Sequence, residues 1–203
     1  MIRTLTDFQT GYLRLPNAKT APNEADFTTG IQEVIDEKER EILIDGLGVT
    51  LYDTLVTEYA DLGTASQPIL DLVNGKNYEV NGIAVKWEGL VNNPFLGCYI
   101  YYHFMQEKQD IFTTMGTQKP DAVNSQAVSS IDRAVRMHRK FIKGYQGGDN
   151  MPIYISTPLM SGIDYQGAQS KIRSLYQFLQ DNISDYPTAT DFVPHTPINT
   201  FGI

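Results

Sequence analysis

Apolar residues recur every three or four positions along most of the chain, which is the spacing that places them on one face of an α-helix. Glycine and proline interrupt this pattern at several points, among them Gly46, Gly48 and the "GYQGG" run. Such residues commonly end helices. The predicted helices are residues 26–45, 49–59, 94–108, 125–145 and 168–183, with an additional short helix at 69–73. The pattern therefore predicts a mainly α protein, a helical bundle of about five helices.

The same spacing predicts which side chains face the core. In the second helix these are Leu51, Tyr52, Leu55, Val56 and Tyr59, and in the last helix Ile172, Leu175, Tyr176, Leu179 and Ile183. The helix over residues 94–108 is apolar or aromatic nearly all round, which is typical of a central helix that other elements contact on several sides.

A short segment with a different pattern precedes this aromatic helix. Residues 77–87 alternate between polar and apolar positions around Asn81–Gly82, a strong sequence signal for a two-residue β-hairpin turn. A two-stranded hairpin is marginally stable alone in water, so we expect Trp87 and Tyr78 to pack it on the aromatic helix. Two interpretations stay open: the hairpin is a local cap over the core, or it presents Asn81 and Gly82 rigidly to another protein, which is either a neighbouring subunit or a different partner.

Both ends of the chain lack a helical period. Residues 1–22 contain short β-like stretches and are expected to form an N-terminal arm, followed by a helical domain over 23–183. Residues 184–203 contain three prolines, which block helix formation. They also keep the apolar residues Tyr186, Phe192, Val193, Ile198, Phe201 and Ile203. The sequence predicts an extended arm that becomes ordered on a partner, with wrapping over the chain's own last helix as the alternative.

Two of the predicted helices carry charges of opposite sign on their outer faces. The outer face of helix 26–45 contains "EVIDEKERE", whereas helix 125–145 carries a basic outer face. The basic residues are Arg133, Arg136, Arg139, Lys140 and Lys143. Both faces could simply be solvated, or they could pair between adjacent subunits and fix the direction of the contact. In the second case the basic face is expected to meet protein or outer solvent.

Composition limits the function classes. A net charge of −8 and a pI near 4.8 disfavour tight, non-specific binding of nucleic acid. No segment approaches the roughly 20 apolar residues that cross a bilayer, and no signal peptide is recognisable. These features predict a soluble protein that does not bind membranes and is made in a reducing cytoplasm, with Cys98 as a small buried hydrophobe.

Catalytic signatures are missing from the sequence. His103, His138 and His195 form no metal-binding motif, and a structural role is expected for each of them. No phosphate-binding loop follows a strand, and no G-x-S-x-G nucleophile motif occurs. The prediction is a protein that is not an enzyme and that has no catalytic residues, cofactor or metal.

The order of the segments resembles a known family. An N-terminal "LTDFQTGYLRLPN" is followed by "LIDGLGVTLYDTLVTEY", "LVNGKNYEVNGIAVKWEGL", "YIYYHFM" and "TTMGTQKPDAVNS" before the basic helix. This order is similar to that of head-to-tail connector (adaptor) proteins of tailed phages and prophages of Bacteroidota, including crAss-like phages. The resemblance covers about residues 1–145, and the segments are distinctive in combination.

This resemblance implies a virion protein at the neck, next to the portal vertex. Such a subunit would form a homo-oligomeric ring, usually of 12 copies, between the portal protein and a downstream neck or tail protein. DNA would pass through the ring only as cargo. The expected contact residues are Asn81, Gly82, Arg133, Arg136, Arg139, Lys140, Phe192, Val193, Ile198 and Phe201. The alternatives are another phage neck or tail completion protein, and a cytoplasmic helical binding module or unrecognised enzyme.

Overall fold

The computed structural model describes residues 2–14, 24–107, 111–113, 116–118, 130–147, 171–187 and 191–196. Within these ranges the predicted mainly α fold with a small hairpin is confirmed. The helices are α1 (Glu24–Tyr59), α2 (Gln67–Asn74), α3 (Phe95–Glu107), α4 (Ser130–Tyr145) and α5 (Leu175–Asp181). The hairpin consists of β1 (Lys76–Val80) and β2 (Ile83–Trp87), and β3 (Ile111–Thr113) pairs with β4 (Gly116–Gln118) in a second antiparallel pair that the sequence pattern did not predict.

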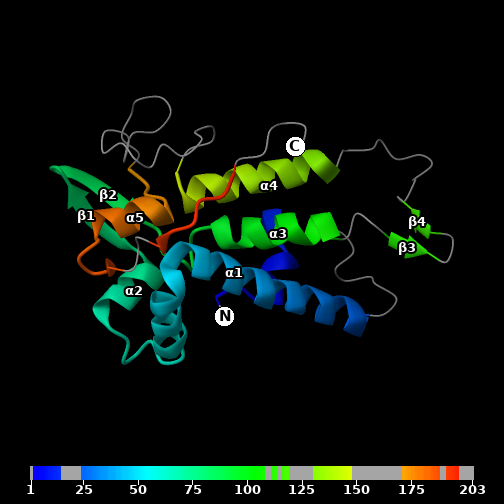
Figure 1. Cartoon of the computed structure of the whole chain (residues 1–203), viewed down its shortest axis with the longest axis horizontal. Coiled ribbons are helices and arrows are strands. Elements are labelled where there is room, and N and C mark those ends of the chain that lie inside the picture. The colour runs from blue at the N-terminus through cyan, green and yellow to red at the C-terminus, as the bar shows by residue number, and fades with distance from the viewer. Residues whose placement is uncertain are drawn as a thin grey trace.

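Helix α3 lies between α1 and α4 and is the centre of the core (Figure 1). The prediction of a helix contacted on several sides is confirmed, because consecutive residues of α3 are buried. These are Phe95, Leu96, Cys98, Tyr99, Ile100, Tyr101, Tyr102 and Phe104. Helix α4 packs on this aromatic surface through Met137, Phe141, Ile142 and Tyr145.

The two predicted helices over residues 26–45 and 49–59 are the two arms of α1. Gly48 separates them with φ 75° and ψ 161°, a left-handed conformation that favours glycine. We call residues 24–47 the first arm and residues 49–59 the second arm. The second arm turns away from α3 toward α2 (Figure 1). Leu55 is buried there, but the prediction that Val56 is buried is wrong: its side chain is 52% exposed, because the second arm is packed on one side only.

The N-terminal segment corrects another prediction. Residues 2–14 do not form β-like stretches but two 3₁₀ helices, η1 (Leu5–Phe8) and η2 (Gly11–Leu13). The local reason is a capping interaction, in which Asp7 accepts a hydrogen bond from the backbone N–H of Thr4 at 2.8 Å. Phe8 and Leu13 are buried in the core, so this segment packs on the chain's own helices α1 and α3.

Helix α5 is shorter than predicted. It begins at Leu175, because Ser174 caps it: the Ser174 hydroxyl accepts the N–H of Gln177. The preceding residues run beside β2, where Lys86 and Ile172 form a parallel bridge. The prediction that Ile172 faces the core is therefore wrong, and its side chain is exposed. The same prediction is wrong for Ile183, which is exposed because α5 ends at Asp181.

Candidate functional site

The hairpin is fixed to the body mainly through Trp87. Its buried ring stacks on Phe178 of α5 with the ring centroids 5.3 Å apart, and its Nε1–H donates to the carbonyl of Leu72 at 3.0 Å. Phe95, the first residue of the aromatic helix α3, contacts Trp87 with the ring centroids 6.5 Å apart. The start of α3 thus contacts the hairpin as expected, and α5 provides the stacking partner that the sequence did not predict.

Tyr78 adds a second attachment between the hairpin and α5. Its ring meets Phe178 edge-on, and its hydroxyl donates to Asp181 at 2.9 Å. Burial raises the pKa of Tyr78, and the neighbouring Asp181 carboxylate raises it further. Asp181 also lies 2.9 Å from the Nε of the buried Arg173 side chain. The base of the hairpin is therefore held by stacking and by a charged hydrogen-bonded group.

The tip of the hairpin has the geometry that the sequence predicts. Asn81 and Gly82 have φ values of 51° and 77°, as a type I′ turn requires, and Val80 pairs with Ile83. Both tip residues are exposed. The hairpin of β1 and β2 lies at an end of the molecule (Figure 1). The structure thus combines a fixed base with an accessible tip.

Two of the four predicted contact residues on α4 meet the N-terminal segment of the chain. Arg133 donates to the backbone carbonyls of Tyr12 and Arg14 at 2.8 and 3.1 Å, and Lys140 lies over the Tyr12 ring. These two predicted contact residues therefore bind the chain's own N-terminal segment. Arg136 and Arg139 are exposed on the same helix. Which surface this helix faces in an assembly stays a prediction.

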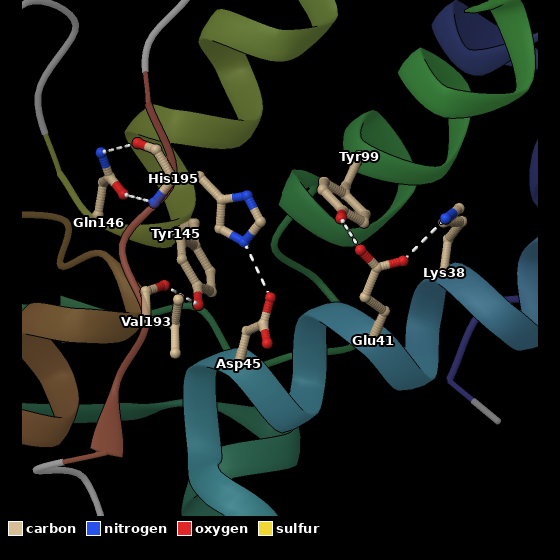
Figure 2. Close-up of polar contacts among 8 residues, drawn as sticks. All are labelled: Lys38, Glu41, Asp45, Tyr99, Tyr145, Gln146, Val193 and His195. Atoms are coloured by element: carbon tan, nitrogen blue, oxygen red, sulfur yellow. Dashed lines mark hydrogen bonds and ion pairs between the residues drawn. The ribbon is translucent and has the colours of Figure 1, made fainter.

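Residues 191–196, which we call the C-terminal strap, lie across α1 and α4 (Figure 2). The Val193 N–H donates to the carbonyl of Asp45 at 2.7 Å, and the Tyr145 hydroxyl donates to the Val193 carbonyl at 2.8 Å. Gln146 exchanges two hydrogen bonds with the backbone of His195, both 2.9 Å long. The His195 ring lies 3.2 Å from Asp45. Each end of the strap is thus tied to the helical body.

The strap corrects the expectation of a tail that orders only on a partner. Phe192 stacks on Tyr145 with centroids 4.5 Å apart and also contacts Tyr176 of α5. Tyr186 is buried, and its hydroxyl donates to the carbonyl of Pro68 at 2.7 Å. Over these residues the tail wraps over its own core, because aromatic side chains find apolar partners there. The predicted contact residues Ile198 and Phe201 lie outside the described residues.

All three histidines belong to one aromatic cluster. His195 meets Tyr99, Phe141 and Tyr145 edge-on. His103 contacts Tyr99 and Tyr102, and His138 contacts Tyr102 and Phe141. The Tyr99 hydroxyl donates to Glu41, which pairs with Lys38 at 2.8 Å (Figure 2). The cluster joins α1, α3, α4 and the strap.

His138 is the most enclosed member of this cluster. Its burial on the apolar side of α4 is confirmed, but its Nδ1 has no hydrogen-bond partner within the part of the chain that the structure describes. Burial lowers the pKa of His138 to about 4, because the charged ring would lose its hydration; the nearby His103 and His195 act in the same direction. The ring is therefore neutral at pH 7 and serves packing.

This burial predicts a pH dependence of stability. The pKa of His138 is lower in the folded chain than in the unfolded chain. Its contribution to the free energy of unfolding is therefore fully present above about pH 6.5. That contribution is lost as the pH falls toward 4, because in this range only the unfolded chain binds the proton. The loss amounts to at most roughly 3 kcal/mol from this residue. We expect His138→Phe to unfold at a denaturant midpoint that depends less on pH between 6.5 and 4 than that of the unmodified protein. Parallel curves for the two proteins would contradict this assignment.

A groove of about 250 Å³ lies between the two arms of α1. It is lined by Ile2, Asp36, Glu39, Arg40, Leu43, Tyr52, Leu55, Val56 and Tyr59. The buried Glu39 carboxylate accepts the N–H groups of Ile2 and Arg3 at 2.8 and 2.7 Å. Burial raises the pKa of Glu39, and these two backbone hydrogen bonds partly offset the effect. Sequence patterns missed this groove, although Gly48 signalled the break that creates it.

Neither metal chemistry nor thiol chemistry has a site in the described part of the chain. Among those residues no group of three or more His, Cys, Asp or Glu side chains could hold a metal ion. Cys98 is buried as expected, and burial raises the pKa of its thiol to about 11, which leaves it protonated at neutral pH. No described helix is both long and apolar enough to cross a membrane.

Sequence patterns offered wrapping of the tail over the last helix only as the alternative, and they missed the seat of the strap on α1 and α4. Asp45, Tyr145 and Gln146 carry no local signal for this role, since their partners lie 48 or more positions away in the chain. The geometry thus presents two surfaces of interest, the hairpin tip and the groove of α1. Comparison with known proteins gives no relative to set beside them: no protein-family model, no curated protein and no solved structure matches the chain.

Proposed function

We propose that this chain is a structural virion protein, a head-to-tail connector subunit that docks on the portal and extends the DNA channel toward the tail. The observation that carries the proposal is the hairpin, which lies at one end of the molecule (Figure 1). Trp87 and Tyr78 fix its base to the body, while Asn81 and Gly82 stay exposed. A rigid projecting element suits a docking contact, because little conformational entropy is lost on binding. The order of segments, which is similar to that of connector proteins, supports the same function.

Ring formation needs two different surfaces on each subunit. Helices α1 and α4 lie on opposite sides of α3 (Figure 1). Exposed Asp36 and Glu37 are on α1, and exposed Arg136 and Arg139 are on α4. Contacts between unlike surfaces generate a closed ring when their rotation closes, and charge of opposite sign gives them direction. A ring of 12 copies follows from the resemblance, with DNA as passing cargo.

Binding to the portal protein encoded in the same genome tests this proposal. We expect the chain to form rings on isolated portal particles, visible by electron microscopy, and to be present in purified virions. Ala84→Lys should weaken portal binding about tenfold or more, because it places a charge beside the hairpin tip. The exposed Ala84 pairs across the strands with Glu79, so the new lysine leaves the hairpin itself intact.

The matched control is Thr6→Lys, which adds the same charge at an exposed position of η1, outside the hairpin. It should bind the portal like the unmodified chain. Absence of the chain from virions, or attachment to a lower neck protein in place of the portal, would contradict the proposal. If Ala84→Lys bound the portal as tightly as the unmodified chain, the hairpin would be interpreted as a cap over the core and not as the docking element.

A further inference from the structure

The second arm of α1 carries a line of apolar side chains toward solvent. Val49, Tyr52, Val56 and Tyr59 follow one another at steps of three, four and three residues, so they form one stripe along the helix. Val49 is 61% exposed and Val56 52%, and both tyrosines are half-buried. We call these four residues the second-arm stripe. Side chains at this spacing are the ones that interdigitate with a second helix.

The groove between the two arms of α1 adjoins the second-arm stripe along one side. Tyr52, Val56 and Tyr59 belong to both, and Ile2 and Leu43 complete the apolar lining on the other side. A helix placed along the stripe could therefore insert side chains into a preformed space, the mode in which amphipathic helices bind grooves. The stripe spans about 15 Å, so such a helix needs about three turns.

Charge around the stripe has mostly one sign. Between Glu41 and Gly75 the chain has acidic residues but no Lys, Arg or His. Asp53 is exposed beside the stripe, and the exposed Asp36 lines the far side of the groove. Arg40 is the basic side chain among the described lining residues, and Arg3 lies close enough to Glu39 to act on its pKa. A helix lying in the groove would thus have carboxylates along both of its edges.

We propose that the second-arm stripe and the adjoining groove bind an amphipathic helix of another protein, with apolar side chains on its inner face and Lys or Arg along its edges. This goes beyond the connector proposal and does not depend on it. A second copy of this chain fits poorly. Its own stripe would set Asp53 against Asp53. Between Arg133 and Tyr145 of its basic helix α4 the apolar residues are buried in its core, which leaves charged side chains on that stretch to meet the stripe.

A synthetic helical peptide tests the proposal on the full-length chain. The probe has about three heptads, with Leu on the inner face and Lys along both edges. The comparison peptide has Glu in place of Lys. Calorimetric titration should show saturable binding of the Lys peptide and no binding of the Glu peptide. Asp36→Lys combined with Asp53→Lys should weaken binding of the Lys peptide and create binding of the Glu peptide, because both edges change sign.

Val56→Asp separates docking on the stripe from plain attraction to an acidic protein. The substitution makes the surface more negative, so attraction alone would tighten binding of the Lys peptide. Docking predicts the opposite, a loss of about tenfold or more, because a carboxylate replaces a contact in the centre of the stripe. Ile183→Asp makes the same change at an exposed apolar position outside the stripe, and it should bind the Lys peptide like the unmodified chain.

Three results would overturn the proposal. The first is no binding of the Lys peptide, and the second is binding to Val56→Asp that is equal to or tighter than binding to the unmodified chain. The third is a dimer of the unmodified chain in sedimentation that Val56→Asp abolishes, which would make a second copy the occupant. Circular dichroism of each variant verifies that it is folded, as expected for changes at exposed positions.

Discussion

Replacing Trp87 with alanine is expected to lower the free energy of unfolding by about 3 to 5 kcal/mol, as measured by chemical denaturation. The ring is fully buried between the hairpin, α5 and the start of α3, where it contacts Phe178 and Phe95. Its removal leaves a cavity where three elements meet, and it also removes the hydrogen bond to the Leu72 carbonyl. A loss of this size is a large part of the stability of a typical domain.

The variant Trp87→Phe distinguishes stacking from hydrogen bonding. It keeps an aromatic ring against Phe178 but has no N–H to donate. The Leu72 carbonyl still accepts the Leu90 N–H at 3.0 Å, so it is not left unsatisfied. We therefore expect a loss of only about 1 to 2 kcal/mol. If Trp87→Ala unfolded within about 1 kcal/mol of the unmodified chain, the ring would not be the support of the hairpin.

Deleting residues 186–203 is expected to destabilise the protein by about 5 kcal/mol or more, enough to unfold most of it. The deletion removes the buried Tyr186, the Phe192 ring that stacks on Tyr145, and the strap with its hydrogen bonds to Asp45 and Gln146. Loss of helical circular dichroism and aggregation on purification would report the effect. A soluble, folded monomer would show that the strap contributes little to the core.

A shorter deletion is the matched control. Removing only residues 197–203 keeps the whole strap and Tyr186, so we expect stability close to that of the full chain. This variant also tests the remaining part of the tail prediction, because it lacks Ile198 and Phe201. A folded protein that no longer assembles on the portal would assign these residues to a partner. Unfolding of this shorter variant would instead assign residues 197–203 to the chain's own core.

Local sequence signals predicted the helices and the hairpin well where those signals act over a few residues. The Asn81–Gly82 turn occurs as expected, α2 ends at Asn74, one residue beyond the predicted range, and the break predicted at Gly46 or Gly48 lies at Gly48. The errors arose where a periodic pattern hides a change of environment. Ile172 continues the helical spacing of α5, yet Ser174 starts that helix, and Ile172 lies beside β2.

The candidate surfaces were predictable to different degrees. The hairpin tip follows from a two-residue turn, and turn geometry depends on the residues themselves. The contacts of Arg133 and Phe192 could not be predicted from the sequence. The charge or hydrophobicity of a side chain indicates that it needs a partner, but it does not identify that partner. Arg133 binds carbonyls of residues 12 and 14, and Phe192 stacks on Tyr145. Both partners lie far away in the chain, and only the folded arrangement brings them close.

By itself the sequence determined the helical class, the hairpin with its turn, the central position of the aromatic helix and the opposite charges of α1 and α4. Each of these depends on spacing or composition within one segment. Only the tertiary structure decided that α5 supports the hairpin, that the strap closes over Asp45 and Tyr145, and that Val56 faces solvent while Leu55 is buried. The physical reason is that burial depends on what packs against a face, and this depends on residues distant in the chain.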